Sequence, residues 1–146
     1  MTDFIDPTRE AFAAFRGLPR QGPIQMLNLV RFRDRAAYSD DHPNAGVGLS
    51  GADAYRLYGK TAGPVLKRVG GRQLWLARPE FTLIGPEGER WDIAFVAEYP
   101  SPEAFATMIH DAEYREAVKH RQAAVADSRL VRMEPSAAGD NFGEAR

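Results

Sequence analysis

The chain lacks cysteine and has no excess of charge of either sign. Without cysteine there is no disulfide, no thiolate nucleophile and no cysteine-ligated metal. The 19 basic and 20 acidic side chains leave a formal net charge of -1 at pH 7. Broad binding of nucleic acid needs a basic face that neutralises phosphates, so this balance argues against nucleic acid as a partner.

Long apolar runs are also missing. No stretch approaches the roughly 18 residues that a membrane span requires. Residues 1–7 lack the basic start and the apolar run of a secretory signal. We therefore expect a cytoplasmic protein with no membrane partner. The length of 146 residues is typical of a single domain, which buries enough surface to fold without a disulfide or a metal.

Hydrophobic periodicity predicts the secondary structure. Strands are predicted at residues 24–32, 72–78, 91–99 and 129–134, and a short helix at residues 7–15. Longer helices are predicted after the N-cap residues Ser50 and Ser101, with Asp111 capping a continuation of the second one. Strict alternation in the second strand would put Gln73, Trp75 and Ala77 on the same face.

The order of these elements predicts the fold. After the N-terminal helix it is the ferredoxin-like βαββαβ pattern, an α+β fold with helices on one face of a four-stranded antiparallel sheet. In a single copy the other face would meet water, yet both strand faces are apolar or mixed, which favours a homodimer. We expect an N-terminal helical extension at 1–23, the ferredoxin-like domain at 24–135 and a flexible tail at 136–146.

Several short motifs also resemble a known family. They are the helix ending in Gly70-Gly71-Arg72, the strand that runs into Pro100-Ser101-Pro102-Glu103, and the helix start Asp111-Ala112-Glu113-Tyr114. Through them, residues 55–133 resemble small bacterial proteins of unknown function in the dimeric α+β-barrel superfamily. Asp111-Ala112 stands where that family usually has serine-proline, and loop 34–51 resembles an insertion. The resemblance implies the fold and the dimer but no activity.

The wider superfamily gives a range of expectations for function. It includes cofactor-free monooxygenases, muconolactone isomerases and haem-binding proteins, which place their ligands between the sheet and the helices. Our enzyme hypothesis is a cofactor-independent oxygenase or isomerase. The alternative is a ligand-binding or accessory domain without catalysis. We expect neither a bound cofactor nor a metal.

Histidine and aspartate at a helix junction are the candidate catalytic residues. Asp111 could orient His110 as a general base in a cleft between sheet and helices. Alternatively, Asp111 is only the N-cap of a helix and His110 a partly exposed linker residue. His120 lies between Lys119 and Arg121, which predicts a solvated helix face.

A set of polar and aromatic residues could line a pocket for a small, possibly aromatic substrate. Asn28 is a polar residue on an otherwise apolar strand face, and such a side chain needs a hydrogen-bond partner when buried. The remaining predicted binding residues are Tyr55, Tyr58, Arg72, Trp75 and Trp91. The alternative is a plain core together with a dimer interface, because aromatic residues on strands usually pack.

Three further motifs are weaker. Residues 46–51 match G-x-G-x-x-G, but the preceding strand ends too early and the acidic partner of a dinucleotide site is missing, so a mobile loop is the better interpretation. His42 with Asp40 and Asp41 could ligate a divalent metal, although such loop residues commonly bind none. The basic string 31–35 lacks the wider basic face that RNA binding requires.

Overall fold

The computed structural model describes residues 3–19 and 21–143 of the chain. The elements within these residues are α1 (Arg9–Gly17), β1 (Ile24–Phe32), α2 (Gly51–Arg68), β2 (Arg72–Ala77), β3 (Ile93–Tyr99), α3 (Pro102–His110), α4 (Ala112–Ala124) and β4 (Val125–Met133). The predicted βαββαβ order is confirmed, and the second helical region is divided at Asp111 into α3 and α4.

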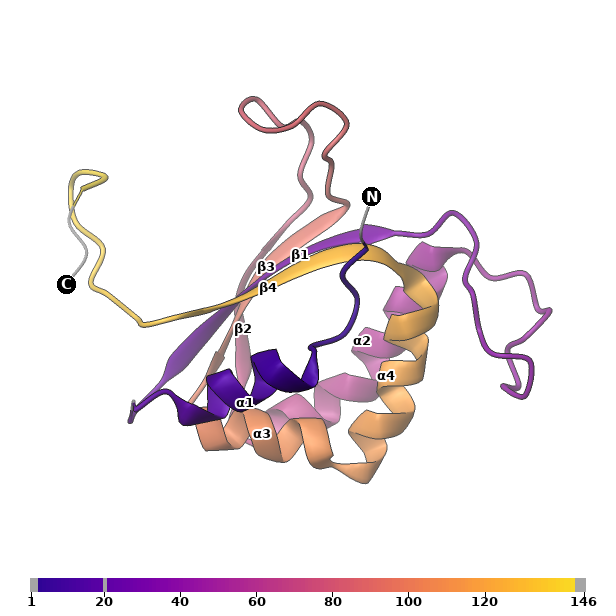
Figure 1. Cartoon of the computed structure of the whole chain (residues 1–146), viewed down its shortest axis with the longest axis horizontal. Helices are drawn as coiled ribbons and strands as arrows, with labels where there is room; N and C mark the ends of the chain where they lie inside the picture. Colours follow the sequence, from indigo (N-terminus) through magenta and orange to yellow (C-terminus); the bar gives the residue numbers. More distant parts are fainter. Residues whose placement is uncertain (1–2, 20, 144–146) are drawn as a thin grey trace.

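The strands form an antiparallel sheet with β1 at its centre. β1 pairs with β3 on one side and β4 on the other, and β2 pairs with β3. The resulting order, β2-β3-β1-β4, with helical connections from β1 to β2 and from β3 to β4, is the ferredoxin-like α+β fold. Figure 1 shows the helices gathered on one side of the sheet. We call this side the inner face and the opposite side the outer face.

The register of β1 assigns its neighbours to the two faces. Met26 and Val30 face inwards and are 3% and 1% exposed. Asn28 lies between them on the same face. Its Cα partners are Phe95 on β3 and Leu130 on β4, which therefore also face inwards.

β2 departs from the predicted alternation. Gln73 lies opposite Ala97, whereas Trp75 lies opposite Val96, and the register shifts between them. Ala97 packs in the core beneath the helices, and its neighbour Val96 faces outwards. The prediction that Gln73 and Trp75 share a face is wrong, because a bulge adds a residue to the strand and reverses the alternation after it.

β4 begins at Val125, earlier than the predicted start at Arg129. The Val125 side chain is fully buried and the residue pairs with Phe32 at the end of β1. This long-range pairing, rather than the local sequence pattern, sets the start of the strand. The predicted N-caps are confirmed at Ser50, Ser101 and Asp111.

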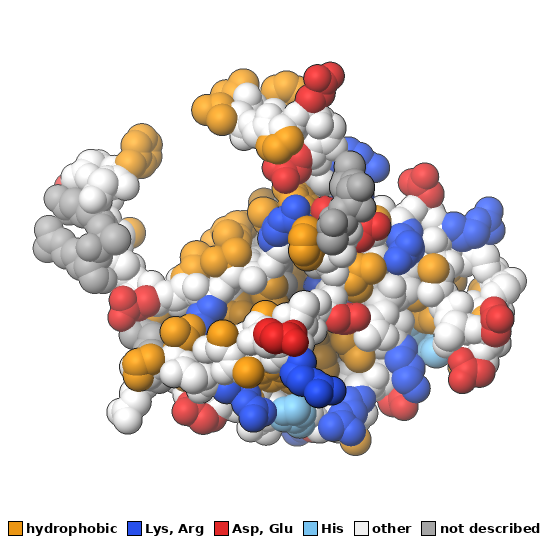
Figure 2. All heavy atoms as spheres, viewed as in Figure 1, with side chains coloured by type: hydrophobic (Ala, Val, Ile, Leu, Met, Phe, Trp, Pro, Cys, Tyr) orange, Lys and Arg blue, Asp and Glu red, His pale blue; other side chains and the backbone are white. Residues whose placement is uncertain are grey.

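The connection between β2 and β3 projects from the body of the protein (Figure 1). We call residues 78–92 the β2–β3 arm. Its side chains Phe81, Leu83 and Ile84 are 81%, 84% and 93% exposed. Figure 2 shows these apolar side chains at the tip of the arm, and further apolar side chains along the sheet below it.

The glycine-rich segment 46–51 has a structural role. Gly46 and Gly48 have φ values of 77° and 86°, a region that favours glycine. At Gly51 a Cβ atom would lie 2.0 Å from the backbone oxygen of Arg33 and 2.9 Å from that of Ala124. Because Gly51 has no side chain, the backbone at the start of α2 can pack directly against the end of β1 and the end of α4. In the described part of the chain, none of the helices has the length and apolar character needed to cross a membrane.

We predict that Gly51→Ala destabilises the protein by roughly 3 kcal/mol, because the added methyl group clashes with backbone that cannot move aside. Gly59→Ala, in the middle of the same helix, is the matched control: a Cβ there meets nothing within 4 Å. It should stabilise the protein by about 0.5–1 kcal/mol through the better helix propensity of alanine. Urea denaturation measures both effects, and equal stability of the two variants would contradict the close-packing argument.

Candidate functional site

The inner face contains a row of side chains that the helices leave partly uncovered. Asn28 and Phe95 lie on the two central strands and are still partly exposed, and Leu130 beside them is 41% exposed. Along β1, the neighbours of Asn28 on this face are both buried. The helices therefore leave the middle of the inner face incompletely covered. We call this region the sheet–helix cleft.

The buried core divides at this row. One cluster of buried residues contains Met26 and Tyr114, and a second contains Val30 and Tyr55. Partly buried Tyr58 and Phe95 pack against both clusters. The sheet–helix cleft thus lies where the two halves of the core meet.

Tyrosines from two helices supply polar groups to this region. The hydroxyls of Tyr58 on α2 and Tyr114 on α4 are 2.8 Å apart and hydrogen-bonded. The ring of Tyr55 lies 5.3 Å from that of Tyr58. Burial raises the pKa of all three tyrosines. Their hydroxyls are therefore neutral at physiological pH and act as hydrogen-bond donors and acceptors rather than as bases.

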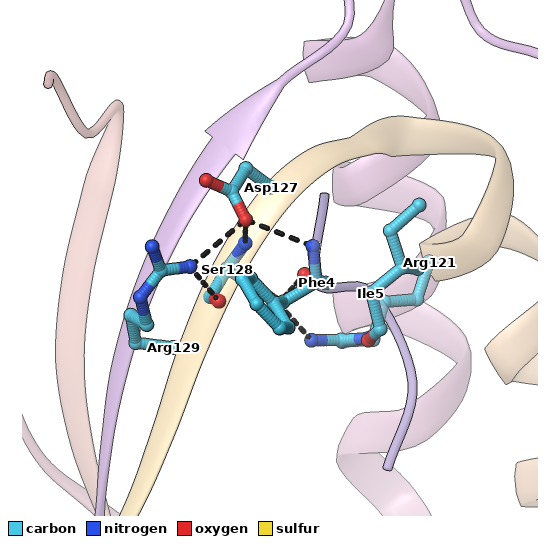
Figure 3. Close-up of polar contacts among 6 residues, drawn as sticks. All are labelled: Phe4, Ile5, Arg121, Asp127, Ser128 and Arg129. Atoms are coloured by element: carbon cyan, nitrogen blue, oxygen red, sulfur yellow. Dashed lines mark hydrogen bonds and ion pairs between the residues drawn. The ribbon is translucent and has the colours of Figure 1, made fainter. Parts of the chain in front are cut away.

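The N-terminal segment is fastened to the edge strand β4 (Figure 3). The Phe4 N–H donates to Asp127 Oδ1 over 3.0 Å, and Ser128 Oγ donates to the Phe4 oxygen over 2.7 Å. Arg121 on α4 donates to the oxygen of Ile5. Burial opposes ionisation of Asp127, but hydrogen bonds from the Phe4 N–H and Arg129 hold its pKa below the usual range.

A second attachment holds the end of α1. Arg132 Nη1 donates to the Phe15 oxygen over 2.9 Å, and its guanidinium carbon lies 4.8 Å from the centre of the Phe15 ring. The inner face of β4 contains every second residue of the strand, namely Ser128, Leu130 and Arg132. Residues 4–15 are thus anchored on either side of Leu130, and we call them the N-terminal arch. The described structure leaves Leu130 exposed between the two anchors, at the mouth of the sheet–helix cleft.

The predicted catalytic pair lies at the junction of α3 and α4. The exposed His110 ring stacks on Phe12 of α1, with 6.0 Å between the ring centres. Asp111 caps α4 by accepting from the Glu113 N–H and binds Arg68 over 2.9 Å. The hydrogen bond from Arg68 holds the pKa of Asp111 below its usual range. These contacts give both residues a structural role, and a catalytic role for them stays a prediction.

The predicted pocket residues are divided between the two faces of the sheet. Asn28, Tyr55 and Tyr58 lie on the side of the helices, where Asn28 Nδ2 donates to the Met26 oxygen over 3.1 Å. The other three lie elsewhere. Arg72 bonds Glu98, its partner in the sheet, over 3.0 Å; Trp75 faces outwards; and the Trp91 ring lies 5.2 Å from the Arg129 guanidinium carbon.

Sequence reasoning missed Tyr114 and the polar residues that hold the arch, namely Arg121, Asp127, Ser128 and Arg132. Asp127 and Ser128 are both 6% exposed, the buried polar residues of the described chain. Their polar character within an apolar strand is the signal that could have identified them, since buried polar groups need partners.

His120 is less exposed than predicted. Its Nδ1 lies 2.6 Å from the Tyr38 hydroxyl, and its ring meets His42 edge-on at 5.5 Å. His42 stacks on Tyr38 at 4.5 Å and accepts the Asn44 N–H through Nδ1. The prediction of a solvated face is wrong at this position, because loop 34–51 folds back over α4. Across residues 3–19 and 21–143, no group of three acidic or histidine side chains is arranged to hold a metal.

Comparison with known proteins identifies a family model that matches more than half of the chain. A family model described as a domain of unknown function, DUF1330, matches residues 45–134. The crystal structure of the methylated RPA0582 protein has 56% sequence identity, a TM-score of 0.88, and coverage of 96% of this chain and 100% of that chain.

Two further crystal structures are similar. That of the RPA0582 protein of unknown function from Rhodopseudomonas palustris has 55% identity and a TM-score of 0.86, covering 94% of this chain and 100% of that one. That of a dimeric protein of unknown function with a ferredoxin-like fold from Bacteroides fragilis has 16% identity and a TM-score of 0.45, covering 77% of this chain and 95% of that one. No curated protein matches.

We predict that His120 makes the protein less stable in mild acid. Burial, followed by the charge of His42, lowers the pKa of His120 from its usual 6.5, while Glu116 opposes the shift. The folded state therefore resists protonation that the unfolded state accepts, and stability falls as the pH drops below about 6.5 towards the folded pKa.

The titration of the His120 ring by NMR and urea denaturation between about pH 7 and about pH 5 test this prediction. The His120→Gln variant should lose less stability over that range than the unaltered protein. A folded pKa at or above 6.5 would contradict the burial of the ring.

Proposed function

Because the chain belongs to the DUF1330 family, a domain family of unknown function, we propose its function from the side chains around the sheet–helix cleft. The protein binds a small aromatic molecule between the sheet and the helices of each protomer of a homodimer. The observation that carries this proposal is the incomplete burial of Asn28 and Phe95 in the middle of the sheet. A core that served only stability would be filled at its centre.

The side chains around the cleft match a small aromatic ligand. Phe95 and Tyr58 offer flat apolar surfaces, which pack well against another ring. Asn28 and the Tyr58–Tyr114 hydroxyl pair offer a few polar groups in an apolar surrounding. Small-molecule sites generally combine a mostly apolar wall with a small number of polar groups that fix orientation.

Binding is better supported than catalysis. A cofactor-independent oxygenase or isomerase would need a base near the ligand, and the cleft tyrosines are neutral. His110 is the candidate base, and its ring stacks on Phe12 of the N-terminal arch, beside the cleft rather than inside it. Turnover that depends on His110 would move the proposal from a binding protein to an enzyme.

The outer face supports the homodimer. Leu27 and Leu29 on β1, Val96 on β3 and Val131 on β4 lie on this face by their register. Val131 is 47% exposed, and Trp75 beside them on β2 is also 47% exposed. A second sheet packed on these residues would remove a contiguous apolar surface from water. The exposed apolar tip of the β2–β3 arm would add to the same interface.

We predict that Leu130→Trp weakens ligand binding at least about tenfold, because the larger ring fills the mouth of the cleft. The probe is naphthamide, a neutral aromatic amide, titrated into the full chain and followed by NMR chemical-shift changes at Asn28 and Phe95. Val47→Trp, which adds the same ring to a loop position that is 59% exposed, is the control and should bind normally. Unchanged binding to Leu130→Trp would overturn this position for the ligand.

We predict that Leu27→Glu dissociates the homodimer, because it places a charge between Val96 and Val131 on the outer face. Sedimentation should give twice the chain mass of 16.2 kDa for the unaltered protein and the single mass for the variant. Leu76→Glu makes the same change on the inner side of the edge strand β2 and should leave the dimer intact. A single mass for the unaltered protein at every concentration would exclude this dimer.

A further inference from the structure

Two arginines carry positive charge into the inner face of the sheet without a close carboxylate partner. The Arg121 side chain is 11% exposed, and its nearest acidic oxygen, on Asp6, is 4.0 Å away. Arg132 bonds a backbone oxygen, and no acidic side chain of the described residues forms an ion pair with it. Both arginines are held instead by neutral groups of the N-terminal arch and β4.

Arg132 has in addition an unused donor. Its Nη2 atom is buried and has no hydrogen-bond partner within residues 3–19 and 21–143. A buried donor left without a partner costs about 1–3 kcal/mol, more when the group is charged. A ligand that brings an acceptor group to the mouth of the cleft would supply the partner that this donor lacks.

We propose that the aromatic ligand carries a carboxylate and that Arg132 binds this carboxylate through Nη2. This inference rests on the proposed function, since it assigns a head group to the ligand of the same cleft. A guanidinium forms strong, charge-assisted hydrogen bonds with a carboxylate, which would also compensate the positive charge on the inner face.

The position of Arg132 fits a head-group site. It lies two residues beyond Leu130 on the same face of β4, which is a distance of about 7 Å along the strand. This is roughly the length of a fused pair of aromatic rings, so a ligand that binds Arg132 reaches the sheet–helix cleft with its apolar part. Arg132 also lines a groove of about 440 Å³ together with Leu18, Pro19, Gln21 and Glu134.

The N-terminal arch must move for the carboxylate to bind. Nη2 is enclosed, and the end of α1 is attached to Arg132 through the Phe15 oxygen and ring. Displacement of this end of α1 would expose Nη2 while Phe4 stays attached to Asp127 and Ser128. The arch therefore opens at its Arg132 anchor, and the ligand replaces a contact between α1 and Arg132.

The test compares naphthoate with naphthamide, which have nearly the same shape and differ in charge at neutral pH. With the full chain, we expect naphthoate to bind at least about tenfold more tightly, the usual effect of a hydrogen bond to a charged group. Arg132→Gln should remove this preference, so that the variant binds naphthoate no more tightly than it binds naphthamide. Arg132→Lys keeps the charge and should retain part of the preference.

Two control variants separate the site from the overall charge. Arg56→Gln removes one positive charge from a side chain that is 75% exposed, and it should keep the full preference for naphthoate. Glu134→Gln removes a negative charge from the groove and should bind naphthoate at least as tightly as the unaltered protein. Circular dichroism of each variant confirms that it is folded.

The outcomes distinguish the two proposals. Equal binding of the two probes, or a preference for naphthoate that survives in Arg132→Gln, overturns the carboxylate site and leaves the cleft itself supported. If neither probe shifts the resonances of Asn28 and Phe95, the cleft proposal fails and the carboxylate site fails with it. A preference that disappears only in the Arg132 variants establishes the site.

Discussion

The register between β1 and β4 decides which side chains of β4 face the helices. It places Leu130 opposite Asn28 and so sets Ser128, Leu130 and Arg132 on the inner face. A shift by one residue would turn every side chain of β4 to the other face. Asp127 and Arg129 would then point into the helices, and both anchors of the N-terminal arch would be lost. One pairing thus determines the core, the mouth of the cleft and the attachment of the arch.

The N-terminal arch is held by a few polar and aromatic contacts. None of the described residues of α1 is buried, and an isolated helix of this length is marginal in water. Its position depends on Phe15, which packs against Phe105 of α3 at 5.2 Å, and on the hydrogen bond from Arg132. An element with few buried apolar contacts opens more readily than the core. The same few contacts that place the arch over the cleft therefore also allow it to move.

Local signals in the sequence were sufficient for much of the fold. β1 spans the predicted residues 24–32, because a long, mostly apolar segment between a proline and a charged run permits few alternatives. The three N-caps followed from single side chains that bond the next turn, as Asp111 does. These features depend on residues close together in the chain, where propensity and hydrogen bonding decide the outcome.

The candidate site was only partly predictable, because it depends on long-range contacts. Asn28 was identified by its polarity on an apolar strand face and Tyr58 as a helix residue that could add a polar contact, and both lie on the side of the helices. The bulge in β2 turns Trp75 to the outer face, and the sequence of β2 contains no local signal that predicts the bulge. Phe4 and Asp127 are separated by 123 residues, so their contact follows only from the folded sheet. Hydrophobic periodicity identifies the two faces of a strand. Bulges and contacts between residues distant in the sequence decide which side chains come together on each face.

The two faces of the sheet are connected through Asp127. Its Oδ1 accepts hydrogen bonds from the Phe4 N–H, the Ser128 N–H and the Arg129 guanidinium at once. Arg129 faces outwards, and its guanidinium carbon lies 5.2 Å from the centre of the Trp91 ring and 4.9 Å from that of the Phe4 ring. A single carboxylate oxygen thus accepts hydrogen bonds both from the backbone of the arch and from a cation of the proposed dimer interface. Because Phe4 contacts both Asp127 and Arg129, a movement of the start of the arch would change the surroundings of both residues.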